Sequence, residues 1–154
     1  MQLLNELKQI VNALDAGNID YAVCGGLAMA IYAMPRATLD IDIMIELDSL
    51  FQTKRIVEQL GFRFEAEPLS LHDGDIQIYR LSKIEEHSSE TLILDLMIVT
   101  PAIKKSWQSR QNVHWEEGTL SVISPSGLIE LKSMRGKGQD LDDIDYLRGI
   151  VDED

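Results

Sequence analysis

The chain has 154 residues, of which 45% are hydrophobic, and a net charge of −12. This length and composition predict one domain, residues 1–154, with a hydrophobic core. Its single cysteine, Cys24, excludes a disulfide framework and a cysteine-based metal site. No apolar run is long enough for a membrane helix and no signal-peptide pattern opens the chain, so we expect a cytoplasmic protein with no membrane partner. The acidic balance argues against an extended nucleic-acid footprint, which needs a basic surface.

Helices and strands are predicted along the whole chain. The apolar residues from Leu3 to Leu14 recur at helical spacing, and this helix should end near Gly17–Asn18. The other predicted elements are a strand over 19–24, a helix over 27–34, a strand over 39–47, a helix over 48–61, strands over 62–65 and 76–81 joined by a polar loop (67–75), a strand over 91–99, a helix over 101–111, a hairpin over 113–122, and helices over 125–136 and 141–150. Strands concentrate in a core of residues 1–100, and a hairpin and helices make up residues 101–154. This order predicts an α+β fold with a small C-terminal helical segment.

Three aspartates are candidates for chemistry. Asp40 and Asp42 alternate with isoleucines on one strand, so their carboxylates share a face, about 7 Å apart. Such a pair can converge on a divalent cation, since Mg²⁺ prefers carboxylate oxygens. Asp95 lies within an apolar strand, where a charge is costly to bury unless it is paired or ligates a metal. If these strands are neighbours, three carboxylates share one site. Alternatively, Asp95 pairs with Arg36 or Arg80 or faces water. Asp40 and Asp42 would then be two solvated aspartates on a strand face.

Phosphate-binding groups are expected next to these carboxylates. Gly25–Gly26 precedes a predicted helix, where backbone N–H groups and the helix dipole favour a phosphate. Arg36 could bind a phosphate with its forked guanidinium, and Thr38 could donate its hydroxyl. Alternatively, Arg36 pairs with an aspartate and Thr38 only favours the strand.

A basic segment precedes an acidic one near the end of the chain. Lys132, Arg135 and Lys137 stand just before Asp140–Asp143, an order that suits the dipoles of two successive helices. Alternatively, Lys132 reaches the triphosphate of a bound nucleotide. The three histidines share no spacing and are expected at the surface, and Cys24 is expected in the core rather than as a nucleophile.

These motifs resemble a known superfamily. Gly25–Gly26, thirteen intervening residues and Asp40-Ile-Asp42-Ile resemble the signature of the nucleotidyltransferase superfamily of the DNA polymerase beta type. The local form, Arg36-x-Thr38-x-Asp40-Ile-Asp42, is most similar to the small bacterial nucleotidyltransferases grouped with AbiEii-type toxins. The segment from Leu131 to Asp143 also resembles the Lys-x-x-Arg and Asp-x-x-Asp pattern of that group.

The resemblance implies a nucleotidyltransferase-like mixed β-sheet flanked by helices. It implies that Asp40, Asp42 and Asp95 bind two Mg²⁺ ions, with Mn²⁺ as the alternative, and act as the catalytic residues. Asp95 would assist deprotonation of the acceptor hydroxyl. The nucleotide contacts that it implies are Gly25, Gly26, Arg36, Thr38 and Lys132.

Two functions from different classes are therefore open. The first is a metal-dependent nucleotidyltransferase that moves a nucleoside monophosphate from an NTP, such as ATP, to the hydroxyl of an RNA end, a protein or a small molecule. The second is a catalytically weak or inactive module of the same fold that acts by binding a nucleotide or a partner protein, as one component of a toxin–antitoxin pair. The acidic tail and the small size of the chain motivate the second function.

Overall fold

The computed structural model describes residues 3–32, 40–88, 90–115, 118–135 and 138–153. Its helices are α1 (Leu3–Ala16), α2 (Gly25–Ile31), α3 (Leu50–Gln59), α4 (Lys104–Gln108), α5 (Pro125–Arg135) and α6 (Gly138–Glu153), with 3₁₀ turns at Leu47–Ser49, His72–Gly74 and Pro101–Ile103. The predicted first helix is confirmed: α1 ends just before Gly17, and Asn18 has a φ of 56°, which is typical of a helix C-terminus. None of the described helices is both long and apolar enough to cross a bilayer.

The strands of the described chain form one mixed sheet. They are β1 (Tyr21–Cys24), β2 (Asp40–Ile45), β3 (Phe64–Glu65), β4 (Leu69–Leu71), β5 (Ile76–Ile84), β6 (Thr91–Ile98), β7 (Gln111–Trp115) and β8 (Gly118–Val122). Their order is β3-β5-β6-β2-β1-β8-β7, and β4 also pairs with β5. β2 lies at the centre, antiparallel to β1 on one side and parallel to β6 on the other. The two strands that carry the three candidate aspartates are therefore neighbours.

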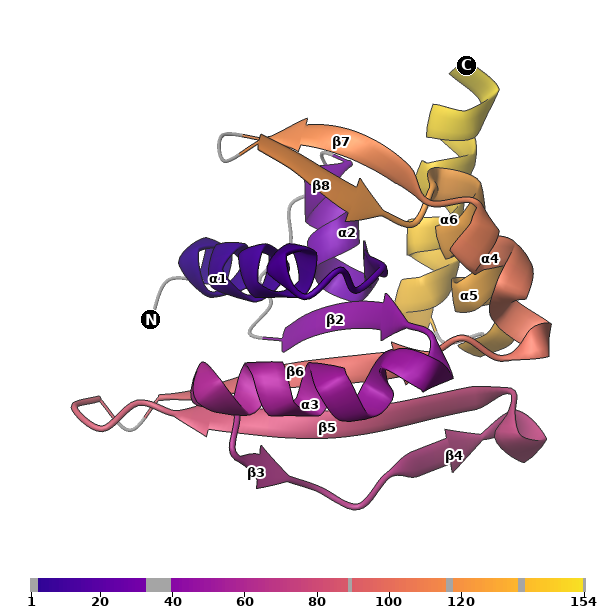
Figure 1. Ribbon diagram of the computed structural model, residues 1–154. Helices are drawn as coiled ribbons and strands as arrows, with labels where there is room; N and C mark the ends of the chain where they lie inside the picture. The colour runs from indigo at the N-terminus through magenta and orange to yellow at the C-terminus, as the bar shows by residue number, and fades with distance from the viewer. Residues whose placement is uncertain (1–2, 33–39, 89, 116–117, 136–137, 154) are drawn as a thin grey trace.

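Helices cover the sheet on both faces. In Figure 1, α1 and α3 lie in front of the sheet, and α2, α5 and α6 lie behind it. Two contacts join the front helices to β5: Lys54 of α3 lies 4.8 Å from the centre of the Tyr79 ring, and Lys83 is 2.9 Å from the Glu6 carboxylate of α1. The fold is thus the mixed α+β sheet flanked by helices that the sequence led us to expect.

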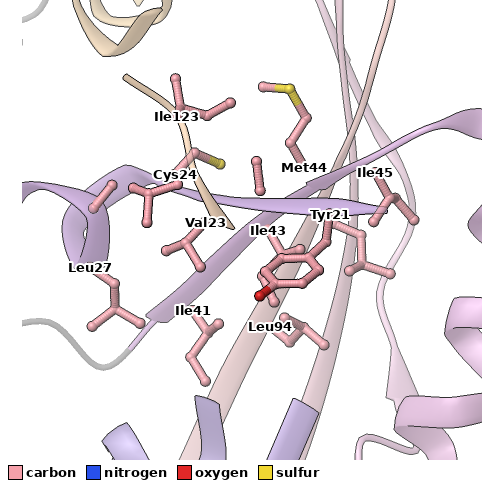
Figure 2. Packing of buried hydrophobic residues seen from close by; sticks show 14 of the residues in the cluster. Tyr21, Val23, Cys24, Leu27, Ile41, Ile43, Met44, Ile45, Leu94 and Ile123 are labelled. Atoms are coloured by element: carbon pink, nitrogen blue, oxygen red, sulfur yellow. The ribbon is translucent and has the colours of Figure 1, made fainter. Parts of the chain in front are cut away.

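The hydrophobic core lies between the sheet and the front helices. Ile41, Ile43 and Ile45 of β2 are completely buried on this face, as are Leu94 and Leu96 of β6. Figure 2 shows the three isoleucines and Leu94 in this cluster. Burying each such side chain stabilises the fold by about 1.5–3 kcal/mol, so the alternation along both strands is strongly fixed. Because alternate residues face opposite ways, the same packing directs the three aspartates to the rear face.

Several predicted boundaries are wrong. α2 begins at Gly25, two residues earlier than predicted, and the rest of the predicted segment beyond 32 lies outside the described residues. The loop predicted over 67–75 contains β4, a three-residue edge strand whose side chains are all exposed, so no burial pattern marks it in the sequence. The last helix begins at Gly138 and ends at Glu153, longer at both ends than predicted. The predicted hairpin is confirmed as β7 and β8, with its turn outside the described residues.

Candidate active site

The three candidate aspartates occupy adjacent positions on β2 and β6. Asp42 is directly opposite Asp95 in the parallel pair and opposite Cys24 of β1 in the antiparallel pair. Neighbouring strands are about 4.8 Å apart, so the side chains of Asp42 and Asp95 project next to each other from the same face of the sheet. Asp40 lies two residues before Asp42 on the same face, opposite Ile93. The expectation that the strand of Asp95 lies beside the Asp40–Asp42 strand is confirmed.

The turn between β1 and α2 packs directly against Asp42. Gly25 has a φ of 64°, and a Cβ atom at this position would lie 2.6 Å from Cγ of Asp42. Only glycine fits such a backbone without displacing the carboxylate. Cys24, the residue before α2, makes no capping hydrogen bond through its side chain. The backbone N–H groups that open α2, including that of Gly26, therefore begin beside a carboxylate without a side-chain cap from Cys24.

Arg80 of β5 binds Asp95 with both ends of its guanidinium. Its Nε donates to Oδ1 of Asp95 at 2.8 Å and one Nη donates to Oδ2 at 2.9 Å. The Asp95 side chain is 10% exposed and that of Arg80 is 40% exposed, so the pair lies at the boundary between core and solvent. The hydrogen bonds that Arg80 donates to Asp95 raise the pKa of Arg80, and the charges of Asp95, Asp40 and Asp42 raise it further. The charges of all three carboxylates therefore act on the same guanidinium, so the carboxylates lie near one another.

A buried lysine and the buried cysteine complete the surroundings of the aspartates. Lys132 of α5 is 6% exposed and Cys24 is 1% exposed. Burial is the main reason that the pKa of Cys24 is well above its usual range; the charges of Asp42 and Asp95 raise it further, and Lys132 lowers it. Lys132 is therefore close enough to act on the same groups as the aspartates. Cys24 lies in the core, as predicted, and its thiol stays protonated at neutral pH.

The sequence-based candidates fall into three groups in the structure. The structure describes Asp40, Asp42, Asp95, Gly25, Gly26 and Lys132. Gly25, Asp42 and Asp95 take part in the contacts given above, and Asp40 and Lys132 act through their charges. Arg36 and Thr38 lie outside the described residues. From the sequence, Arg80 was considered only as an alternative partner of Asp95 and not as a site residue. The sequence does contain a hint of its role, because Arg80 is a cation among the otherwise uncharged alternate residues of its strand.

The carboxylates share a face without forming a ready set of metal ligands. No group of three or more His, Cys, Asp and Glu side chains within the described ranges is arranged to hold a metal ion. Asp95 is turned towards Arg80. The donor chemistry still fits a hard divalent cation, because carboxylate oxygens are its preferred ligands. A carboxylate that accepts a bidentate arginine also keeps a second lone pair on each oxygen.

The candidate site does not coincide with a cavity of about 670 Å³ that the described residues form. This cavity is lined by Asp15, Tyr21, Arg110 and Ser121, among others. Tyr21 is at the start of β1, whereas Cys24 and Gly25 are at its end, so this cavity is separate from the aspartates. We place the candidate site by its chemistry and not by cavity size.

Comparison with known proteins reveals a shared fold. No protein-family model and no curated protein matches the chain. Among solved structures, the candidate nucleotidyltransferase TM1012 of Thermotoga maritima matches 98% of this chain and 93% of its own, with a TM-score of 0.61 and 18% identity. The lincosamide antibiotic adenylyltransferase LnuA, solved with lincomycin bound, matches 95% of this chain and 96% of its own, with a TM-score of 0.62 and 16% identity. ANT(2'')-Ia, solved in complex with adenylyl-2''-tobramycin, matches 94% of this chain and 87% of its own, with a TM-score of 0.65 and 16% identity. At these identities the likeness establishes the fold, which is the one found in nucleotidyltransferases.

Proposed function

We propose that the protein is a metal-dependent nucleotidyltransferase that moves a nucleoside monophosphate from an NTP to an acceptor hydroxyl. The observation that carries this proposal is the register that sets Asp42 opposite Asp95, with Asp40 on the same face and Gly25 packed against Asp42. The fold shared with LnuA and ANT(2'')-Ia supports it. Phosphoryl transfer needs little covalent chemistry from a protein beyond positioning and charge stabilisation, which such a cluster offers.

Asp40 and Asp42, with Asp95, would hold Mg²⁺ or Mn²⁺ through their oxygens. When bound, two such ions stabilise the attacking and the leaving oxygen of an in-line displacement. Within this chain, the backbone N–H groups of Gly25 and Gly26 would bind the nucleotide phosphates, and Arg36, Thr38 and Lys132 would be further nucleotide contacts.

The reaction is balanced without a further reactant. The acceptor oxygen forms a bond to the α-phosphorus, and the bond from that phosphorus to the bridging oxygen breaks. Pyrophosphate leaves with that oxygen. The acceptor hydroxyl loses its proton to the Asp95 carboxylate, which Arg80 holds in a fixed orientation, and the proton passes on to solvent.

A small-molecule acceptor and ATP as donor are the combination that we favour. The complexes of LnuA with lincomycin and of ANT(2'')-Ia with an adenylyl product motivate this choice. The net charge of −12 works against RNA as the acceptor, because a nucleic-acid footprint needs a basic surface. A cytoplasmic setting, where ATP and Mg²⁺ are plentiful, suits this reaction.

The test is pyrophosphate release by the purified chain with Mg²⁺ and each NTP, with lincomycin, tobramycin or cell RNA and protein as acceptors. Mass spectrometry of the acceptor should reveal an added nucleoside monophosphate. Asp95→Asn should lower turnover by at least about 100-fold, in line with the loss of a catalytic acid–base group. Asp40→Asn should also lower turnover, because it removes a carboxylate oxygen from the proposed metal ligands. Asp48→Asn, which changes an exposed aspartate just after β2, is the matched control and should keep full turnover. Absence of pyrophosphate release with every NTP and acceptor would contradict the proposal.

A second function is favoured by one specific contact. Because Arg80 already neutralises Asp95, the aspartate could serve only to hold β5 against β6. The protein would then bind a nucleotide or a partner protein, such as the other component of a toxin–antitoxin pair, without turnover. Calorimetric titration with a non-hydrolysable NTP distinguishes the two functions. Binding that Asp95→Asn leaves unchanged, with no pyrophosphate release from the wild type, would support the second function and exclude the first.

A further inference from the structure

On the side of β5, the rear face of the sheet carries exposed apolar side chains in the described part of the chain. Four apolar side chains gather there, and we call them the β5 apolar face: Phe64 of β3, Leu69 and Leu71 of β4, and Ile78 of β5. Their exposed fractions are 58% for Phe64, 44% for Leu69 and 45% for Leu71, and Ile78 is partly exposed. Large apolar side chains that are exposed together mark binding surfaces more often than single ones do.

The strand register sets this face on the same side of the sheet as the aspartates. Arg80 is opposite Asp95, and Ile78 is two residues before Arg80 on the same face. Leu69 is directly opposite Ile78. Phe64 lies opposite Ser82, which is two residues after Arg80. The β5 apolar face is therefore continuous with the candidate active site through the Arg80–Asp95 pair.

The other face of β5 has a different role. Tyr79 and Lys83 point the opposite way, where they contact Lys54 of α3 and Glu6 of α1. In Figure 1, α3 lies in front of β5. The front of β5 is thus part of the core, whereas on its rear Ile76 is buried, Ile78 is partly exposed and the neighbouring Leu69, Leu71 and Phe64 are exposed. Packing of the described residues does not explain why the rear carries leucine and phenylalanine.

The strand order gives the site a direction. The order of the residues in space across the rear face is Gly25 after β1, Asp42 on β2, Asp95 on β6, Arg80 on β5 and Leu69 on β4. In an in-line displacement, the attacking oxygen approaches opposite the leaving one. If the nucleotide phosphates lie at the Gly25 end, the acceptor must approach from the β5 end.

We propose that the β5 apolar face binds the apolar body of the acceptor, so that the acceptor is a hydroxyl-bearing small molecule with a hydrophobic part. This inference rests on the proposed nucleotidyl transfer. The face offers no unpaired cation for a nucleic-acid backbone among its described residues, because Arg80 is held by Asp95. None of its four described residues is a carboxylate that would bind a polycationic acceptor. An apolar body is the chemistry that matches it.

The area of the face suits a small molecule better than a second copy of the chain. A large apolar side chain presents at most about 200 Å². At the exposed fractions seen here, Phe64, Leu69 and Leu71 together offer roughly 300 Å². A stable protein interface needs about 800 Å² from each partner. The β5 apolar face alone falls well short of that area.

The experiment uses two probes that differ only in an alkyl chain: octyl glucoside below its micelle concentration, and glucose. Backbone amide shifts of the full chain should move at Leu69, Leu71 and Ile78 with octyl glucoside and stay in place with glucose. Leu69→Ser/Leu71→Ser should weaken octyl glucoside binding at least tenfold. Leu4→Ser, which changes a leucine of α1 that is 59% exposed, is the matched control and should bind as the wild type does.

Two further measurements separate the possible failures. Sedimentation that reveals a wild-type dimer, dissociated by Leu69→Ser/Leu71→Ser, would identify the face as a subunit interface and overturn the inference. Shifts that appear elsewhere, or with glucose alone, would overturn it as well. Pyrophosphate release from ATP tests the proposed function independently. If the protein releases pyrophosphate but does not bind octyl glucoside at this face, only the acceptor inference is refuted. If it binds octyl glucoside but releases no pyrophosphate under any condition, both the acceptor role and the proposed function are refuted.

Discussion

Replacement of Gly25 by alanine tests whether the turn after β1 positions Asp42. The new Cβ would lie 2.6 Å from Cγ of Asp42, whereas real Cβ atoms keep at least 3.0 Å. Asp42 or the turn must therefore move by several tenths of an ångström, and the carboxylate oxygens by more. The φ of 64° adds about 1–2 kcal/mol of strain for any residue with a side chain. A displacement that approaches 1 Å can cost about 100-fold in rate, so we expect turnover to fall by about that factor.

The matched control for this variant is Gly74→Ala. Gly74 has a φ of 89°, but the nearest atom to an added Cβ is 3.8 Å away, on Gln77. Urea denaturation should reveal a loss of about 1–2 kcal/mol for Gly74→Ala, from strain alone, and a larger loss for Gly25→Ala. Pyrophosphate release should be unchanged in the control. If Gly25→Ala loses no more stability than Gly74→Ala and keeps full turnover, the close contact does not position Asp42.

Four other predictions concern stability, each measured by urea or thermal denaturation. Thr53→Val should stabilise the protein by about 1 kcal/mol, because Oγ1 of Thr53 is buried with no hydrogen-bond partner in the described part of the chain. Lys83→Met should lower the free energy of unfolding by about 3 kcal/mol, because it leaves the Glu6 carboxylate, which is only 9% exposed, without its cation. Adding Glu6→Leu should recover most of that loss. The buried thiol of Cys24 has a raised pKa, so its contribution to the free energy of unfolding is fully present below pH 9.0. Above pH 9.0 the free energy of unfolding should fall by about 1.4 kcal/mol per pH unit, and Cys24→Ala should remove this pH dependence. Chelation by EDTA should leave the thermal midpoint unchanged, whereas Mg²⁺ at ten times its Kd should stabilise the protein by about 1.4 kcal/mol.

Each of these predictions has an outcome that would contradict it. Thr53→Val that destabilises the protein would mean that the hydroxyl has a partner. Equal losses for Lys83→Met and for the double variant with Glu6→Leu would mean that stability comes from packing of the lysine stem and not from its charge. An unchanged alkaline slope in Cys24→Ala would assign that slope to the tyrosines. Unfolding by EDTA would mean that a metal is required for the fold.

The sequence indicates the central strands and the faces of the sheet better than its edges. The alternation of isoleucine and aspartate in β2 predicts both the core face and the carboxylate face, and the structure confirms both. In contrast, β4 is a short edge strand that buries nothing, so its pairing with β5 is decided by tertiary contacts that local pattern does not encode. The division into residues 1–100 and 101–154 stays a prediction, although β8 of the second part pairs with β1 of the first.

The partner of Asp95 illustrates the limit of sequence reasoning at the site. A charge in an apolar strand requires compensation, and the sequence allowed either a metal site or an arginine. The structure contains the arginine and also sets Asp42 beside Asp95, so the two alternatives are not exclusive. The choice of Arg80 depends on the antiparallel register between β5 and β6, which the polar segment between them does not determine. The contact of Gly25 with Asp42 likewise depends on the pairing of β1 with β2.

Two cations among the described residues offset part of the negative charge of the three carboxylates. Arg80 binds Asp95, and its raised pKa reflects Asp40 and Asp42 as well. Lys132 is buried on the same side of the sheet. Among the described residues, three negative and two positive groups leave one formal negative charge, which a partly solvated site tolerates at modest cost. A divalent cation would reverse the sign of that charge, and the negative triphosphate of an NTP would restore it. On this count we expect the fold to form without the metal, and we expect the metal to bind mainly together with a nucleotide.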